Sequence, residues 1–207
     1  MRPFFRQQRF AWGVAALFSF TIAMNVSIAS ELNQAKADLN AGDYQSAIQI
    51  FARLAVQGDV SAQYSLGSIH SRGYGTPKNF ALAAVWFRKA AEQGHIEAQY
   101  DLGGMYRRGE GVQKDAKVTV KWWRKSANAG DAFAQSGLGD LYIAGEGVKR
   151  DLVQAYKWKM LSEPRLKAGR VPWGALGMRD LAKQLTPSQL GAGQREVRKW
   201  VAARKKQ

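Results

Sequence analysis

The stretch Ala98–Gly130, AQYDLGGMYRRGEGVQKDAKVTVKWWRKSANAG, is the middle copy of a unit that occurs three times. The copies begin at Ala62, Ala98 and Ala134, 36 residues apart, and the first two share 14 of 36 positions without a gap. A fixed period of this length is typical of repeat proteins, whose units bury their apolar faces only against their neighbours. The sequence therefore predicts a stack of similar units.

Each unit is predicted to contain two helices joined by a glycine-containing loop. Apolar residues spaced by three and four predict a first helix over Ala62–Arg72. Gly73 suits the left-handed conformation that ends a helix. The second helix is expected to begin at an N-cap that recurs in identical register, at Asn79, Asp115 and Asp151.

Two further positions recur inside the predicted helices. The first helix carries a glycine where the backbones of a helix pair are expected to meet, at Gly67, Gly103 and Gly139. The second carries a tryptophan that is expected to fill the gap between neighbouring units, at Trp86, Trp122 and Trp158. Both positions are therefore interpreted as packing residues.

The repeats divide the chain into six parts. Residues 30–61 form a degenerate N-terminal capping repeat, with Asp43 as the N-cap of its second helix. Full repeats follow at 62–97 and 98–133, and a truncated third repeat at 134–163 is expected to end at Ser162-Glu163-Pro164. Residues 164–207 form a basic helical cap, with helices expected over Trp173–Gln184 and after a capping box at Thr186–Gln189.

The N-terminal residues 1–29 have the pattern of a signal peptide. Three arginines precede the uncharged apolar run Phe10–Met24, and Ser27 and Ala29 place small residues at the expected cleavage site. We expect a periplasmic or secreted bacterial protein that has no integral membrane span after cleavage. An uncleaved inner-membrane anchor is the alternative.

The composition excludes cysteine chemistry and places most of the positive charge at the C-terminal end. The chain has no cysteine, so disulfides and thiolate chemistry are excluded. Of the formal net charge of +15, residues 149–207 hold 15 basic and 4 acidic side chains. This basic end either aids solubility or attracts an anionic surface. The basic residues grouped on and beyond the last predicted helix are Arg195, Arg198, Lys199, Arg204, Lys205 and Lys206.

The motif Ala-Gln-Tyr-x-Leu-Gly-x-x-Tyr-x-x-Gly-x-Gly-Val at 98–112, followed by Asp115 and Trp122, resembles the Sel-one-like repeat (SLR) family. The resemblance implies a right-handed, tetratricopeptide-like α-solenoid with a C-terminal capping helix, used as an adaptor for partner proteins, including partners in the cell envelope. It also implies that the first helix of each unit lines the concave face. Members that act on β-lactams carry a disulfide in each repeat, so that activity is the least favoured alternative here.

Residues that resemble catalytic or ligand-binding motifs are better explained by their roles in turns and packing. Glycine pairs such as Gly73-x-Gly75 lack the strand and the Lys-Ser/Thr of a phosphate loop. His70 and His95 lack a second ligand at metal spacing. The sequence therefore predicts no enzyme, cofactor, metal or nucleic-acid partner.

Two hypotheses for binding follow. In the first, a protein partner binds the concave face and contacts Arg72, Arg107, Arg108 and Trp123. The alternative for the three arginines is that they only solvate the ends of their helices. Trp123 stays open as a contact residue because the equivalent Lys159 is expected to reach solvent. In the second, the basic C-terminal helix binds an anionic envelope polysaccharide or lipid.

Overall fold

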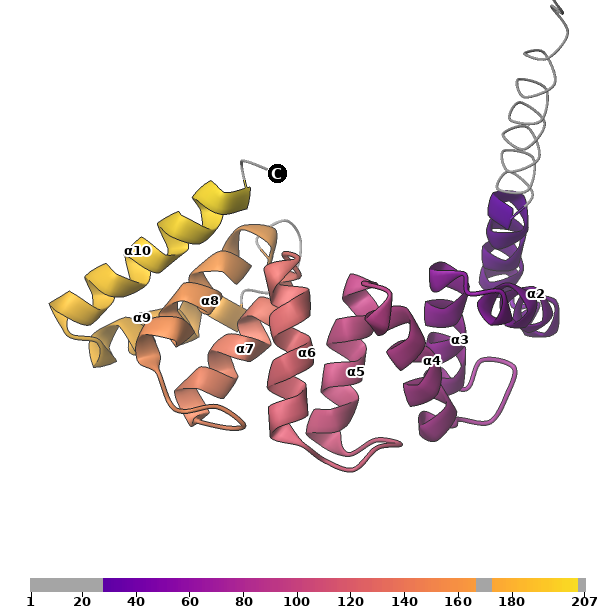
Figure 1. Cartoon of the computed structure of the whole chain (residues 1–207), viewed down its shortest axis with the longest axis horizontal. Helices are drawn as coiled ribbons and strands as arrows, with labels where there is room; N and C mark the ends of the chain where they lie inside the picture. The colour runs from indigo at the N-terminus through magenta and orange to yellow at the C-terminus, as the bar shows by residue number, and fades with distance from the viewer. Residues whose placement is uncertain (1–27, 167–172, 205–207) are drawn as a thin grey trace, which may run out of the picture.

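The computed structural model describes residues 28–166 and 173–204, and all regular structure in these ranges is α-helical. The helices follow one another along one curved row, with the N-terminal helices at one end and α10 at the other (Figure 1). After a helix over residues 28–41, the elements are α2 (Tyr44–Val56), α3 (Val60–Arg72), α4 (Phe80–Glu92), α5 (Ile96–Arg108), α6 (Ala116–Asn128), α7 (Ala132–Ala144), α8 (Leu152–Leu166), α9 (Trp173–Gln184) and α10 (Pro187–Arg204). The predicted all-α solenoid is confirmed.

Side-chain caps set where the helices begin. The predicted N-caps Asp43, Asn79 and Asp115 each accept a hydrogen bond from the first turn of α2, α4 and α6. Asp151 does the same for α8. The first helices begin two residues upstream of Ala62, Ala98 and Ala134, because a cap that the sequence analysis missed precedes each of them, at Asp59, His95 and Asp131.

The glycine inside each first helix makes room for a side chain, which corrects the expectation that two backbones meet there. A Cβ at Gly103 would overlap the indole of Trp123, with Nε1 only 2.7 Å away. The equivalent Gly67 faces the ring of Phe87, and Gly139 faces the stem of Lys159. The residue after the recurring tryptophan therefore packs inside the unit.

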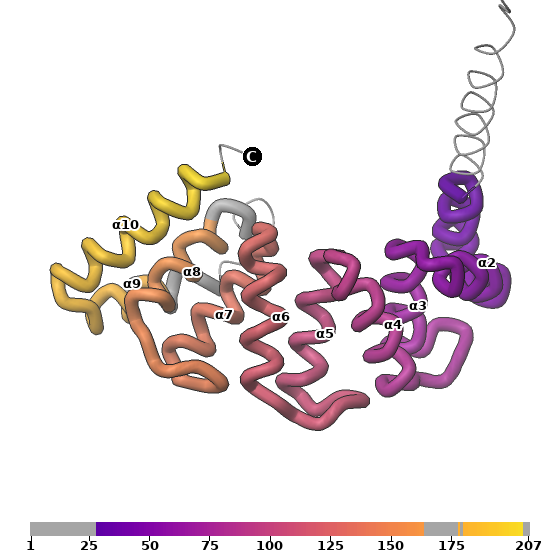
Figure 2. Tube along the Cα trace, viewed as in Figure 1, coloured from indigo at the N-terminus to yellow at the C-terminus, as the bar shows by residue number. Residues whose placement is uncertain are grey.

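The second glycine of each loop joins one unit to the unit before it. Gly111 has a φ of +66°, and a Cβ there would overlap the backbone of Phe80 at the start of α4. Gly147 approaches Ala116 at the start of α6 in the same way. The loops between α5 and α6 and between α7 and α8 lie along the same edge of the stack (Figure 2).

Buried polar side chains also connect successive units. The Nε2 atoms of Gln63, Gln99 and Gln135 donate at 3.0–3.1 Å to carbonyls at the end of the preceding second helix. Each of these carbonyls also accepts from the glycine N–H that follows its helix, so the bond chiefly gives the buried glutamine amide a partner and ties it to the preceding unit.

Two tyrosine hydroxyls accept hydrogen bonds across the units in the same register. Arg88 donates to Tyr106 at 2.7 Å, and Arg124 donates to Tyr142 at 3.1 Å. At the equivalent place in the first unit, His70 replaces the tyrosine. The His70 carbonyl still accepts from Asn79 N, at 2.8 Å, so the departure from the motif leaves the loop unchanged.

The end of α8 differs from the prediction. Helix α8 continues to Leu166, two residues past Pro164, so the Ser162-Glu163-Pro164 break is wrong. The buried Ser162 hydroxyl donates at 2.8 Å to Lys159 O, so this hydroxyl is satisfied within its own helix.

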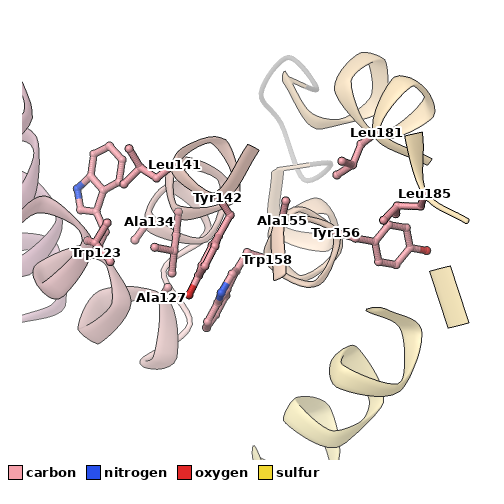
Figure 3. Close-up of a cluster of buried hydrophobic side chains, with 12 residues drawn as sticks. Trp123, Ala127, Ala134, Leu141, Tyr142, Ala155, Tyr156, Trp158, Leu181 and Leu185 are labelled. Carbon is pink, nitrogen blue, oxygen red and sulfur yellow. The ribbon is translucent and has the colours of Figure 1, made fainter. Parts of the chain in front are cut away.

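The final helix closes the end of the stack. Thr186 and Gln189 form the predicted capping box. Gly193 lies against the ring of Tyr156, so α10 packs on α8. Figure 3 shows Leu181 and Leu185 on the same side of α8 as Tyr156, within one cluster that seals the last repeat.

Candidate functional site

Two hollows open between consecutive first helices. The polar hollow lies between α3 and α5, has a volume of about 210 Å³, and is lined by residues that include Ser68, Arg72, Asp101, Met105 and Arg108. The aromatic hollow lies between α5 and α7, has a volume of about 350 Å³, and is lined by residues that include Tyr100, Arg107, Trp123, Phe133, Asp140 and Lys159.

The hollows occupy equivalent places in neighbouring units. Three pairs of lining residues are related by the repeat period, with the first member in the polar hollow: Ser71 and Arg107, Phe87 and Trp123, Asp101 and Gly137. Because α3, α5 and α7 have equal lengths and equivalent packing, the hollows follow each other along one face of the solenoid. We call this surface the first-helix face.

A half-buried carboxylate lies in the polar hollow. Loss of solvent raises the pKa of Asp101 to about 6, although the Tyr64 hydroxyl donates to it and Arg72 and Arg108 attract its charge. Burial and the nearby Asp101 charge raise the pKa of Tyr64 to about 12, which keeps that hydroxyl a donor. No basic group in the described part of the chain lies within 4 Å of the Asp101 carboxylate.

The two arginines of this hollow have local partners. Arg108 pairs with Glu110 at 2.7 Å, and Arg72 hydrogen-bonds to Tyr74, whose ring centroid lies 5.9 Å from the guanidinium carbon. These contacts orient both guanidinium groups, which remain exposed. The hollow therefore presents donors and acceptors together.

The junction between the first two repeats also contains the one histidine cap. His95 Nδ1 accepts from Ala98 N at 3.3 Å, and its ring stacks on Tyr64 at 4.4 Å. A protonated Nδ1 cannot accept this bond. Burial lowers the pKa of His95 and so favours the neutral, capping form.

Three rings build the aromatic hollow. Tyr100 stacks on Trp123 with centroids 5.7 Å apart and contacts Phe133 at 6.0 Å. Trp123 Nε1 donates to Tyr100 O at 2.9 Å, which fixes the indole. Phe133 is 45% exposed at the rim, while Trp123 is only 4% exposed.

Lys159 does not reach solvent, contrary to the sequence-based expectation. Its side chain is 8% exposed, its Nζ lies 2.6 Å from Asp140, and it donates to Ser136 at 3.1 Å. The stem lies on Gly139 in place of a ring, and the ammonium finds both partners on α7. The argument that kept Trp123 open as a contact residue is therefore wrong, and Trp123 serves mainly as the floor of the hollow.

The structure separates the predicted binding arginines into the two hollows. Arg72 and Arg108 line the polar hollow, and Arg107 lines the aromatic hollow. Sequence reasoning missed Asp101, Phe133 and the Lys159 network. Their signal was a departure from the repeat, because positions 61, 97 and 133 hold Ser, Glu and Phe, and positions 65, 101 and 137 hold Ser, Asp and Gly.

The basic residues of the C-terminal helix differ in whether they have a partner within the protein. Arg195 and Arg198 are exposed, and Lys199 pairs with Glu196 at 3.0 Å. Arg204 donates to Ala129 O at 2.9 Å and lies over the Trp200 ring, so it holds α10 on the end of α6. Lys205 and Lys206 lie outside the described residues.

Two features of the described residues bear on metal binding and on membrane insertion. No group of three or more His, Cys, Asp or Glu side chains there could hold a metal ion. No described helix is long and apolar enough to cross a membrane.

Comparison with known proteins agrees with this architecture. The Sel1 repeat family matches residues 60–95, 96–131 and 132–158, so its boundaries coincide with the starts of α3, α5 and α7. A protective antigen of uropathogenic Escherichia coli with an SLR fold superposes with a TM-score of 0.74 and 30% identity over 87% of this chain. A Sel1 repeat protein from Oxalobacter formigenes superposes with a TM-score of 0.62 and 31% identity over 64% of this chain.

The chain is a Sel1-repeat protein. It spans 39% of the length of the Escherichia coli antigen and 55% of the Oxalobacter protein. No curated protein matches the sequence. Sel1 repeats typically mediate protein–protein interaction, and the family is generally a non-catalytic scaffold.

Proposed function

We propose that the protein is a non-catalytic scaffold that binds a partner protein along its first-helix face, in the bacterial cell envelope. The observation that carries the proposal is the pair of equivalent hollows on consecutive repeats. A partner segment that runs along the face meets both hollows in turn, which is how stacked repeats provide extended binding surfaces.

The side chains of the hollows favour binding over catalysis. Ser136 and Lys159 resemble a nucleophile and a base, but the Lys159 ammonium pairs with Asp140 and donates to the serine oxygen. A base must instead accept the hydroxyl proton. β-Lactam hydrolysis stays the least favoured alternative, and a chromogenic β-lactam tests it directly.

The envelope location rests on the leader-like residues 1–29. Export with cleavage predicts a mature N-terminus at Ser30 in the periplasmic or secreted fraction, and N-terminal sequencing of the isolated protein reads it. An intact leader in the membrane fraction supports the inner-membrane anchor instead.

A second candidate function is binding of an anionic polysaccharide or lipid through α10. The exposure of Arg195 and Arg198, without an acidic side chain within 4 Å among the described residues, favours it. Arg204 donates to Ala129 O and is still exposed, so its charge stays on that surface.

Capture of partners from the native envelope, at low and high salt, separates the two functions. One variant combines Arg72→Ser with Arg107→Ser, and the matched control combines Arg195→Ser with Arg198→Ser. The scaffold proposal predicts a protein that survives high salt and the control substitutions but is lost with the first variant. Salt-sensitive capture of polymer or lipid alone, lost only with the α10 variant, contradicts it.

A further inference from the structure

The aromatic hollow has a rim that the other repeats lack. Phe133 is the second residue of α7, and the equivalent positions hold Ser61 in α3 and Glu97 in α5. Its phenyl ring is 45% exposed and leans on Tyr100 rather than entering the core. An exposed ring beside a hollow provides apolar contact area for a partner.

The floor of the hollow is fixed before anything binds. The Tyr100 and Trp123 planes lie 18° apart, the Trp123 indole is hydrogen-bonded to Tyr100 O, and a Cβ on Gly137 would lie 2.9 Å from the indole Cε3. The indole is therefore held between α5 and α7 and cannot turn out to meet a ligand. A rigid site of this kind loses little conformational entropy on binding.

The charge at the rim is also specific. Arg107 lies over the Trp123 ring, with 5.4 Å between the guanidinium carbon and the ring centroid. Within residues 28–166 and 173–204, no carboxylate comes within 4 Å of it, whereas the adjacent Arg108 is paired with Glu110 and Lys159 is paired with Asp140. Arg107 is thus an exposed cation with an aromatic support and no counter-ion.

We propose that the aromatic hollow binds an aromatic side chain of an extended partner segment, and that Arg107 pairs with a carboxylate next to that side chain. The volume of about 350 Å³ and the Tyr100 and Phe133 rings suit a planar apolar group. Because the Arg107 guanidinium has no counter-ion, it favours an acidic over a basic residue beside the aromatic side chain of the partner. The inference rests on the proposed scaffold function and names the chemistry of its partner.

Selection from a displayed library of random 12-residue peptides tests this inference on the full chain. We expect enriched peptides in which Phe, Tyr or Trp adjoins Asp or Glu. Against such a peptide, Phe133→Ser should weaken binding about 10-fold or more, and Arg107→Ser should weaken it about 3-fold. Arg198→Ser, which removes an exposed arginine of α10 that lines neither hollow, is the matched control. Far-UV circular dichroism of each variant shows that its helices are intact.

Charge reversal in the peptide provides a second readout. Replacing its acidic residue by lysine should weaken binding to the wild-type protein and have little further effect in the Arg107→Ser variant. Substitution of the aromatic residue by alanine should abolish binding in both.

Each other outcome overturns a defined part of the account. Enriched peptides without the aromatic–acidic pair, or binding unchanged by Phe133→Ser, refute this inference and leave the scaffold proposal in place. A library that yields no binder contradicts both. Self-association of the wild-type protein that Phe133→Ser abolishes shows that a second copy of the chain occupies the hollow, and it refutes the partner segment.

Discussion

Replacing Gly103 with alanine tests the packing that holds each repeat together. The new methyl group would overlap the Trp123 indole, which is 4% exposed and is hydrogen-bonded to Tyr100 O. Neither the ring nor α5 can move without disturbing the aromatic hollow. We expect the protein to lose stability although alanine is the better helix former.

The size of the effect follows from two opposing terms. Alanine in a helix interior is favoured over glycine by about 1 kcal/mol, whereas forcing a methyl group into a packed core costs about 1–3 kcal/mol. Because the indole is rigid and tied down, the upper part of that range applies, and a net loss of about 2 kcal/mol is expected. The broken Trp123 hydrogen bond adds to this loss.

The adjacent glycine gives a matched control. At Gly104 a Cβ meets the guanidinium of Arg108, at 3.1 Å, and that side chain is 58% exposed, so it can shift at little more cost than loosening its exposed pair with Glu110. Gly104→Ala should therefore keep the gain in helix propensity, up to about 1 kcal/mol.

Urea unfolding followed by far-UV circular dichroism measures both variants. The midpoint should fall for Gly103→Ala and stay level or rise for Gly104→Ala. Equal stability of Gly103→Ala and the wild-type protein, or equal losses in both variants, would refute the role assigned to the contact between Gly103 and Trp123.

Three further predictions concern charged and titrating groups, each measured by urea unfolding. The Asp101 carboxyl has a folded pKa of about 6 against 3.8 unfolded, so its ionisation opposes folding above pH 6 and this cost fades as the pH falls toward 4. Asp101→Asn should stabilise the fold by about 2–3 kcal/mol at pH 7.5 and by little at pH 4. An equal gain at both pH values would contradict the assignment. His95 has a lowered folded pKa, so its cap is intact above pH 6.5 and is lost as the pH falls through the folded value. In an Asp101→Asn background, stability should decline from pH 7.5 to 5, and His95→Asp should remove that decline; a slope unchanged by His95→Asp would argue against the cap. Asp140→Asn leaves the buried Lys159 ammonium without its carboxylate, whereas Lys159→Met leaves the 51% exposed Asp140 in solvent. Asp140→Asn should therefore lose about 1–3 kcal/mol more of the unfolding free energy than Lys159→Met. The reverse order would contradict the pairing.

The period of the sequence was sufficient to predict the fold because its glycines and caps act locally. Gly73 ends α3 in a left-handed conformation, and Asp115 caps α6, as their residue types and register indicated. These roles depend on a few neighbouring residues, so they can be recognised without the tertiary structure.

The residues of the candidate site depend on contacts between helices, which the period does not reveal. Lys159 was expected in solvent because a lysine rarely replaces a buried aromatic ring. The partners that permit it, Asp140 and Ser136, lie on another helix. In the sequence, Asp101 and Phe133 are visible only as departures from the repeat. Their positions in the two hollows follow only from the tertiary structure.

The contact made by Arg204 and the end of α8 also could not be predicted from the repeat. The sequence placed Arg204 in a basic surface, but its partner is a carbonyl at the end of α6, 75 residues away in the chain. Pro164 was expected to end α8, whereas the helix continues to Leu166.

Site-specific photocrosslinking in the native cell tests the central claim most directly. A photoreactive amino acid replaces Arg107 on the first-helix face in one strain and Arg198 on α10 in another. Our account predicts a discrete protein adduct from position 107 and none from position 198. Protein adducts from position 198 alone, or none from position 107 while the chain is folded and expressed, would contradict the claim that the first-helix face is the protein-binding surface.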